Sequence, residues 1–130
     1  MDSLILPSTF DTPQVAFHPE GSLTISGRAM SAKAWSFFGP LFEWLDEYRK
    51  NPPPSTTLNL EFDILHVDSL VKILDICKSL SVLTKKGCNV TINWYFEKDD
   101  EDMRETASMF SEILKSVRIN EIVIENDKAH

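Results

Sequence analysis

The sequence predicts an α/β fold in which helices pack against a mixed β-sheet. Segments in which apolar and polar residues alternate are separated by segments in which apolar residues recur at helical spacing. Apolar residues also make up 42% of the 130-residue chain and aromatic residues 10%, which is enough to fill one hydrophobic core. We therefore expect a single domain over residues 1–130, with its core between about residues 12 and 124.

The expected order of elements is β-β-α-β-α-β-α-β. An opening β-hairpin supplies an antiparallel pair of strands, and right-handed crossovers through the helices make the later strands parallel. The hairpin is predicted for TPQVAFHPEGSLTISGRA, in which Val15 and Phe17 precede a turn and Leu23 and Ile25 follow it. The turn, at residues 18–21, contains a proline and a glycine that supply its geometry.

A helix is predicted after the hairpin. Ser31 can cap its first turn by accepting a backbone N–H, and Phe38 and Leu45 belong to an apolar pattern with helical spacing. Gly39 and Pro40 interrupt this pattern, because proline lacks an amide proton and its ring clashes with the preceding turn. We expect a kink, or a break into a short helix followed by a second helix that starts near Pro40.

Three strands and two helices are expected after residue 55. The strands at residues 57–63 and 90–96 alternate between apolar and polar side chains, and a short last strand follows at residues 120–126. The helix between the first two ends near Gly87, which suits a left-handed position after a helix. Acidic residues at 99–102 favour the start of the last helix, where backbone N–H groups are unpaired. That helix is expected to bury Met103, Ala107, Phe110 and Leu114.

Composition excludes two classes of partner. The chain has 20 acidic and 13 basic residues and a net charge of −7. This charge argues against general nucleic-acid binding, because clustered lysines and arginines supply the affinity for phosphates. No apolar run reaches the roughly 18 to 20 residues of a membrane span, and the first residues lack a signal-peptide pattern. We therefore expect a cytoplasmic protein that binds neither nucleic acid nor membranes.

The sequence predicts no cofactor and no metal site. Cys77 lies in a helical pattern and Cys88 precedes a strand, and this spacing indicates two reduced structural thiols. The acidic stretch EKDDEDM, residues 97–103, lacks the glycine of an EF-hand loop and is better explained as a charged helix start. The chain contains neither a glycine-rich phosphate loop nor a His-Glu-x-x-His motif.

The junction His-Val-Asp-Ser, residues 66–69, joins a strand to a helix and is the most informative place for function. Sites in α/β sheets lie beyond the carboxyl ends of strands, where helix N-termini attract negative charge. A hydrolase could use His66, Asp68 and Ser69, or Cys77 as its nucleophile, but no Gly-x-Ser-x-Gly motif surrounds Ser69. Asp68 could instead cap the helix, with Ser69 in its first turn. A phosphoryl group on Ser69 would meet a favourable helix dipole, although Asp68 would repel it.

Tyr95 is a second candidate for contact with a partner. Trp94 and Phe96 fit the core, and alternation along the strand places Tyr95 on the other face. A helix could cover Tyr95 there, or a partner protein could contact it.

Three further features of the chain are the stretches TPQVAFHPEGSLTISGRA, FFGPLFEWLDEYRKNPPPSTTLNLEF and VTINWYFEKDDEDM. These stretches resemble the SiaC family of regulatory phosphoproteins, which are small bacterial proteins of this length. The resemblance extends from about Thr12 to Ile124 and implies a fold similar to the STAS domains of anti-sigma-factor antagonists. It also implies a non-enzymatic switch, phosphorylated by a cognate protein kinase and dephosphorylated by a PP2C-type phosphatase. In the best-understood system, the unphosphorylated form activates a diguanylate cyclase, which raises cyclic di-GMP and promotes aggregation or biofilm formation.

The family's phosphoacceptor is a threonine in an Asn-Thr-Ser-Ser-like segment, which corresponds without gaps to residues 66–69 of this chain. Val67 occupies the position of that threonine, so the acceptor does not carry over. Ser69 is the remaining hydroxyl, and an Asp-Ser pair here also resembles the phosphoacceptor site of the anti-sigma-factor antagonists. Ser69 is therefore the candidate acceptor. Alternatively, this member is not phosphorylated there, and Asp68 keeps it in one state or only caps the helix.

The leading hypothesis is therefore a regulator of a diguanylate cyclase, with a binding surface that includes Asp68, Ser69, Lys72 and Tyr95. A negative charge at the helix start would oppose docking of an acidic or apolar partner surface. One alternative is an anti-sigma-factor antagonist that captures an anti-sigma kinase. The other is a small hydrolase that uses Ser69 or Cys77.

Overall fold

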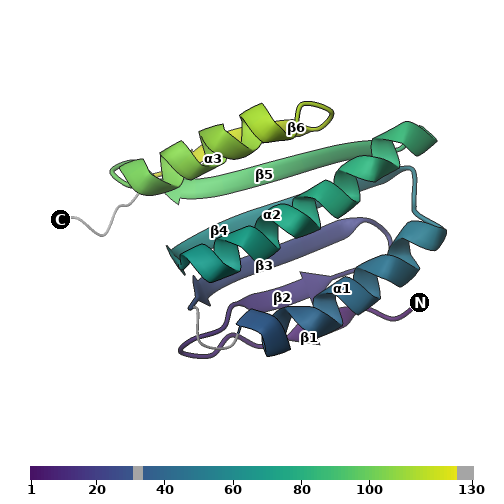
Figure 1. The fold of residues 1–130 in the computed structure, drawn as a ribbon, viewed down its shortest axis with the longest axis horizontal. Helices are drawn as coiled ribbons and strands as arrows, with labels where there is room; N and C mark the ends of the chain where they lie inside the picture. The colour runs from purple at the N-terminus through teal and green to yellow at the C-terminus, as the bar shows by residue number, and fades with distance from the viewer. Residues whose placement is uncertain (31–33, 126–130) are drawn as a thin grey trace.

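The computed structural model describes residues 1–30 and 34–125, and within them it forms one six-stranded β-sheet (Figure 1). The strands lie in the sheet in their order along the chain. They are β1 (Leu4–Leu6), β2 (Gln14–Phe17), β3 (Ser22–Ala29), β4 (Ser55–Leu65), β5 (Asn89–Glu97) and β6 (Arg118–Ile124). The helices are α1 (Ala34–Lys50), α2 (Val67–Ser81), the 3₁₀ helix η2 (Val82–Lys86) and α3 (Glu101–Ile113). No helix in these described ranges has the length and apolar character needed to cross a membrane.

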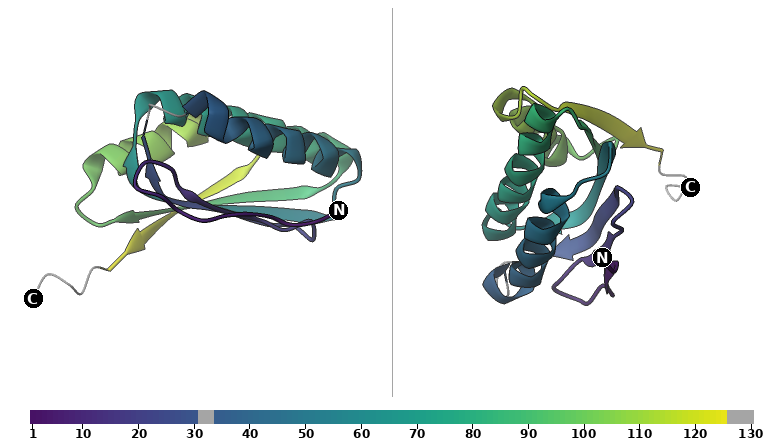
Figure 2. Two further views of the ribbon diagram at one scale, coloured as in Figure 1. Left: turned by 90° about the horizontal axis from the view of Figure 1, so that it is seen from below. Right: turned by 90° about the vertical axis from the view of Figure 1, so that its right-hand side faces the viewer.

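The α-helices α1, α2 and α3 all lie on the same face of the sheet (Figure 2). β1 pairs with β2, and β2 with β3, in antiparallel orientation, whereas β3, β4, β5 and β6 are parallel to one another. Along the chain, each parallel strand is followed by the strand that lies next to it in the sheet. Each right-handed crossover therefore places its helix on the same face of the sheet. The predicted mixed α/β fold with an opening hairpin is confirmed.

β1 is a strand that the sequence pattern did not predict. Its residues pair with β2 and add one strand to the edge of the expected sheet. Three residues are too few for alternation to be recognised in a sequence. Leu4 and Leu6 pack against the core, while Ile5 between them is 56% exposed.

The core fills the space between the sheet and the helices. Trp94 of β5 lies at its centre with no exposed surface. Its ring meets Phe110 of α3 edge-on, with 4.7 Å between ring centroids, and Phe62 of β4 at 6.2 Å. The predicted buried face of α3 is confirmed: it consists of Met103, Ala107 and Phe110, with Leu114 directly after the helix.

α1 is one continuous helix that contains Pro40, so the predicted break at Gly39 and Pro40 is wrong. Proline removes only one backbone hydrogen bond, and Pro40 is exposed. Phe38 and Leu41, on either side of this position, are both buried against the core. The burial of these apolar side chains outweighs the lost hydrogen bond. Ser31, the predicted cap of this helix, lies outside the described residues.

The face of the sheet opposite the helices carries a ladder of three asparagines. Asn93 of β5 donates a hydrogen bond from Nδ2 to Oδ1 of Asn59 on β4, over 3.0 Å. Asn120 of β6 donates in the same way to Oδ1 of Asn93, over 2.9 Å. The three residues are also direct partners in the strand register. The ladder therefore joins β4, β5 and β6 on the polar face and supports their register.

The turn between β2 and β3 yields a test of the fold. Gly21 has a φ of +119°, and a Cβ there would collide with the backbone oxygen of Ser55. We expect Gly21→Ala to lower the free energy of unfolding by about 2 kcal/mol or more. The control is Gly39→Ala, where an added Cβ meets nothing within 4 Å. That change should raise stability by up to about 1 kcal/mol, because alanine favours a helix. Equal effects in urea denaturation would contradict this account.

Candidate functional site

The candidate site lies at the carboxyl end of β4, where the chain enters α2. Only His66 separates the last residue of β4, Leu65, from the first residue of α2, Val67. The His66 N–H donates to the backbone oxygen of Ala29, the last residue of β3, over 2.8 Å. The junction is therefore held against the end of the neighbouring parallel strand.

His66, and not Asp68, caps α2. The backbone of His66 is extended, with φ −73° and ψ 153°, and its Nδ1 accepts the N–H of Asp68 over 3.4 Å. The alternative in which the Asp68 carboxylate caps the helix is wrong, because Asp68 already lies inside the first turn. Its exposed carboxylate is instead a negative charge beside the positive end of the helix dipole.

Ser69 is buried at the start of α2, with 1% of its surface exposed. Its hydroxyl donates to the backbone oxygen of Met30 over 3.1 Å, which ties the first turn of α2 to the end of β3. A kinase could reach this oxygen only if the first turn of the helix opened. Val67, at the position where the resemblance predicts a threonine acceptor, is in contrast 61% exposed.

The four residues predicted to bind a partner do not form one surface. Asp68 is exposed at the start of α2, and Lys72, one turn further along, is half-buried. Tyr95 is half-buried on the opposite face of the sheet, where Glu61 and Ile122 are its neighbours in the strand register. Sequence alternation placed Tyr95 on this face, but only the fold showed that α1, α2 and α3 all cover the other face (Figure 2).

The chemistry of the junction gives no support to a hydrolase. The Ser69 hydroxyl donates to a backbone carbonyl, and His66 Nδ1 accepts a backbone N–H, so these two groups do not activate each other. Cys77 is fully buried, and this burial raises the pKa of its thiol well above the usual value. Among the described residues, no group of three or more His, Cys, Asp or Glu side chains is placed to hold a metal ion.

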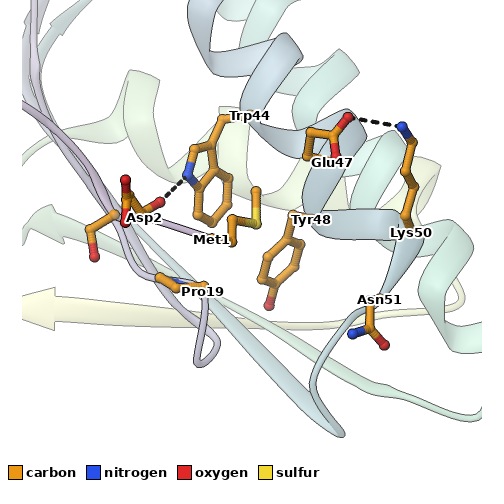
Figure 3. A pocket seen from close by; sticks show the side chains of 9 residues that line it. Met1, Asp2, Pro19, Trp44, Glu47, Tyr48, Lys50 and Asn51 are labelled. Atoms are coloured by element: carbon orange, nitrogen blue, oxygen red, sulfur yellow. Dashed lines mark hydrogen bonds and ion pairs between the residues drawn. The ribbon is translucent and has the colours of Figure 1, made fainter.

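A pocket of about 800 Å³ lies at the other end of the fold and was not predicted (Figure 3). Trp44 and Tyr48 of α1 stack along it, with ring centroids 5.0 Å apart. The Trp44 indole N–H donates to the backbone oxygen of Asp2 over 2.9 Å. The remaining lining residues are Met1, Ser3, Pro19, Glu47, Lys50 and Asn51. These residues come from separate parts of the chain, so no sequence motif could indicate the pocket.

Comparison with known families assigns the chain. The family model described as SiaC family regulatory phosphoprotein matches residues 6–124. The chain belongs to this family. An uncharacterised protein of Pseudomonas aeruginosa (strain UCBPP-PA14) is 24% identical over 113 residues, covering 86% of this chain and 90% of the relative.

Solved structures of SiaC from Pseudomonas aeruginosa share the fold. The crystal structure of apo-SiaC is 22% identical, with a TM-score of 0.84, and the match covers 95% of this chain and 100% of that one. The crystal structure of the diguanylate cyclase SiaD in complex with its activator SiaC also matches, with a TM-score of 0.85 at 22% identity. That match covers 93% of this chain and 99% of the matched chain.

The burial of Ser69 predicts how the junction responds to substitution. Ser69→Ala removes the hydrogen bond to Met30 and should cost about 1–2 kcal/mol of unfolding free energy. Ser69→Asp places a carboxylate in the interior and should cost about 3 kcal/mol or more. Ser79→Ala is the control, because the Ser79 hydroxyl bonds only to Ile76 within α2. Urea denaturation measures all three, and a Ser69→Asp protein as stable as the original would show that the turn opens at little cost.

Thiol labelling tests the burial of Cys77. In a Cys88→Ala background, a disulfide reagent at pH 8 should leave Cys77 unmodified in the native protein and modify it in urea. Desolvation keeps this thiol protonated, and the thiolate is the reactive form. Rapid labelling of the native protein would contradict the position of Cys77 in the core.

Proposed function

We propose that this chain is a non-enzymatic regulator that binds a diguanylate cyclase and controls its activity. The observation that carries the proposal is its membership of the SiaC family over residues 6–124. The likeness to SiaC, which is solved in complex with the cyclase SiaD, supports a partner of this class. A cognate protein kinase and a PP2C-type phosphatase would set the phosphorylation state of the regulator.

The proposed contact surface is the amino end of α2. Ile64 at the end of β4 is 37% exposed and Val67 is 61% exposed, so apolar surface is available there. Asp68 adds a negative charge beside these side chains. A largely apolar partner surface would fit this end of the helix, and the negative charge of Asp68 would oppose its docking. Lys72 extends the surface along α2, whereas Tyr95 would serve a partner on the open face of the sheet.

Ser69 remains the candidate phosphoacceptor. A phosphoryl group there would add about −1.5 to −2 charge, and the modified side chain could no longer donate to Met30. The first turn of α2 would then be displaced, and the partner surface would change with it. In the alternative, Ser69 stays unmodified and Asp68 supplies a permanent negative charge. Mass spectrometry of the protein from its native cells decides between them, because the switch requires phosphate on Ser69.

Cyclase binding and activation test the proposal directly. The purified chain is titrated into a diguanylate cyclase from the same organism, and binding and cyclic di-GMP production are measured together. If negative charge at the helix start opposes docking, Asp68→Asn should strengthen binding about two- to fivefold. Glu112→Gln, which removes an exposed carboxylate from the far end of α3, should leave binding unchanged.

Two outcomes would overturn this proposal. The first is the absence of both binding and activation with every cyclase of the organism. The second is co-purification of an anti-sigma factor from the native cells in place of a cyclase, which would assign the chain to a partner-switching pathway that controls transcription.

A further inference from the structure

The outward side of α2 and η2 carries a charge pattern that is complementary to itself. Residues that alternate three and four positions apart lie along one side of a helix. From the first turn of α2 into η2, six residues with this spacing are all exposed. They are Asp68, Val71, Asp75, Lys78, Val82 and Lys85. We call these six residues the α2 seam.

α2, which carries most of the seam, lies between α1 and α3 in the helix layer (Figure 1). The buried residues Ile73, Ile76 and Leu80 lie on the opposite side of α2 and face the sheet. Val82 and Lys85 belong to η2, which has about three residues per turn, so residues three apart lie above one another. The seam therefore extends from the first turn of α2 through the 3₁₀ helix.

The two valines of the seam are not explained by the helix alone. Val71 is 50% exposed and Val82 is 44% exposed. β-Branched residues lower helix propensity, and apolar surface in water gains stability only when it is covered. The change from acidic residues at the start of α2 to basic residues at its end suits the helix dipole. The dipole does not account for Val71 and Val82, which occupy equivalent positions in the two halves of the seam.

We propose that a second copy of this chain packs its α2 seam antiparallel against the first and forms a two-fold symmetric dimer. The two-fold axis lies at the level of α2 between Ile76 and Cys77. Val71 then meets Val82 of the second copy, Asp75 meets Lys78, and Asp68 meets Lys85. Symmetry produces each of these contacts twice. A parallel arrangement would instead place Asp75 against Asp75 and Lys78 against Lys78.

The charged residues on and around the seam favour pairing along α2 and limit the size of the interface. None of the ion pairs formed by the described residues involves Asp75 or Lys78, so both can pair across the interface. Exposed carboxylates on α1 and α3 flank the seam, among them Glu43, Glu105 and Glu112. They would repel the same helices of the second copy and confine contact to α2. An interface of one helix per copy falls below about 1,200 Å² in total, which is typical of weak, reversible association.

Charge reversal across the axis tests the dimer. Sedimentation of the original chain from about 1 µM to about 1 mM should show a concentration-dependent dimer. Asp75→Lys and Lys78→Asp each place like charges together twice, so each should raise the dissociation constant about tenfold or more. An equimolar mixture of the two variants should restore the dimer, because every Lys then meets an Asp. The double variant carrying both changes should also restore it.

Matched controls separate this pairing from a general effect of charge. Asp99→Lys and Lys115→Asp change the net charge by the same amounts at exposed positions outside the seam. They should leave the mass distribution unchanged, and circular dichroism should show the same helix content in every variant. A monomer at all concentrations would overturn the proposal. A dimer that neither reversal weakens would also overturn it, as would a mixture of the two variants that stays monomeric. This self-association does not depend on the proposed cyclase partner.

Discussion

Each crossover between parallel strands in this chain moves one strand further in the same direction, and the rest of the structure depends on this constraint. A right-handed connection to the adjacent strand must then place its helix on the same face every time. One face of the sheet is therefore apolar and buries Trp94 against Phe110, while the other is polar and holds the asparagine ladder. The alternation of burial along β5, and along β4 as far as Asp63, follows directly from this division.

The same arrangement explains why the candidate site is coupled to the core. The carboxyl ends of the neighbouring strands β3 and β4 lie side by side, and α2 starts there. The hydrogen bonds from His66 to Ala29 and from Ser69 to Met30 join the junction to β3. A charge added at Ser69 would therefore act on the contact between a strand and a helix, not only on the exposed surface. This coupling is a physical route from a local modification to a changed partner surface.

α2 contributes to three parts of the protein at once. Its inner face fills the core, its amino end forms the candidate site, and its outer face carries the seam proposed for self-association. Asp68 belongs to both the candidate site and the seam. Under the two proposals, a partner at the amino end of α2 and a second copy of the chain would compete for the same surface.

The sequence by itself determined the helices and strands that bury a regular pattern of side chains. Alternation located β4 and β5, helical spacing located α2 and α3, and acidic residues marked the start of α3, where Asp100 accepts the N–H of Met103. These features depend on residues that are close together in the chain, so the spacing of apolar and polar residues is enough to predict them. At the junction, the resemblance to the family implied a phosphoacceptor position that Val67 occupies in this chain, and Ser69 as the acceptor stays a prediction.

Tertiary structure decided what depends on contacts between distant residues. β1 exists because β2 offers an open edge, and α1 continues through Pro40 because Phe38 and Leu41 are buried on either side of it. The burial of Ser69 depends on Met30, which is far away in the chain, and the cap at His66 depends on how the backbone leaves β4. Tyr95 is separated from Asp68 because α2, like α1 and α3, lies on the opposite face of the sheet from Tyr95. The spacing of residues along a sequence cannot predict such contacts, because they form only when the strands and helices pack together.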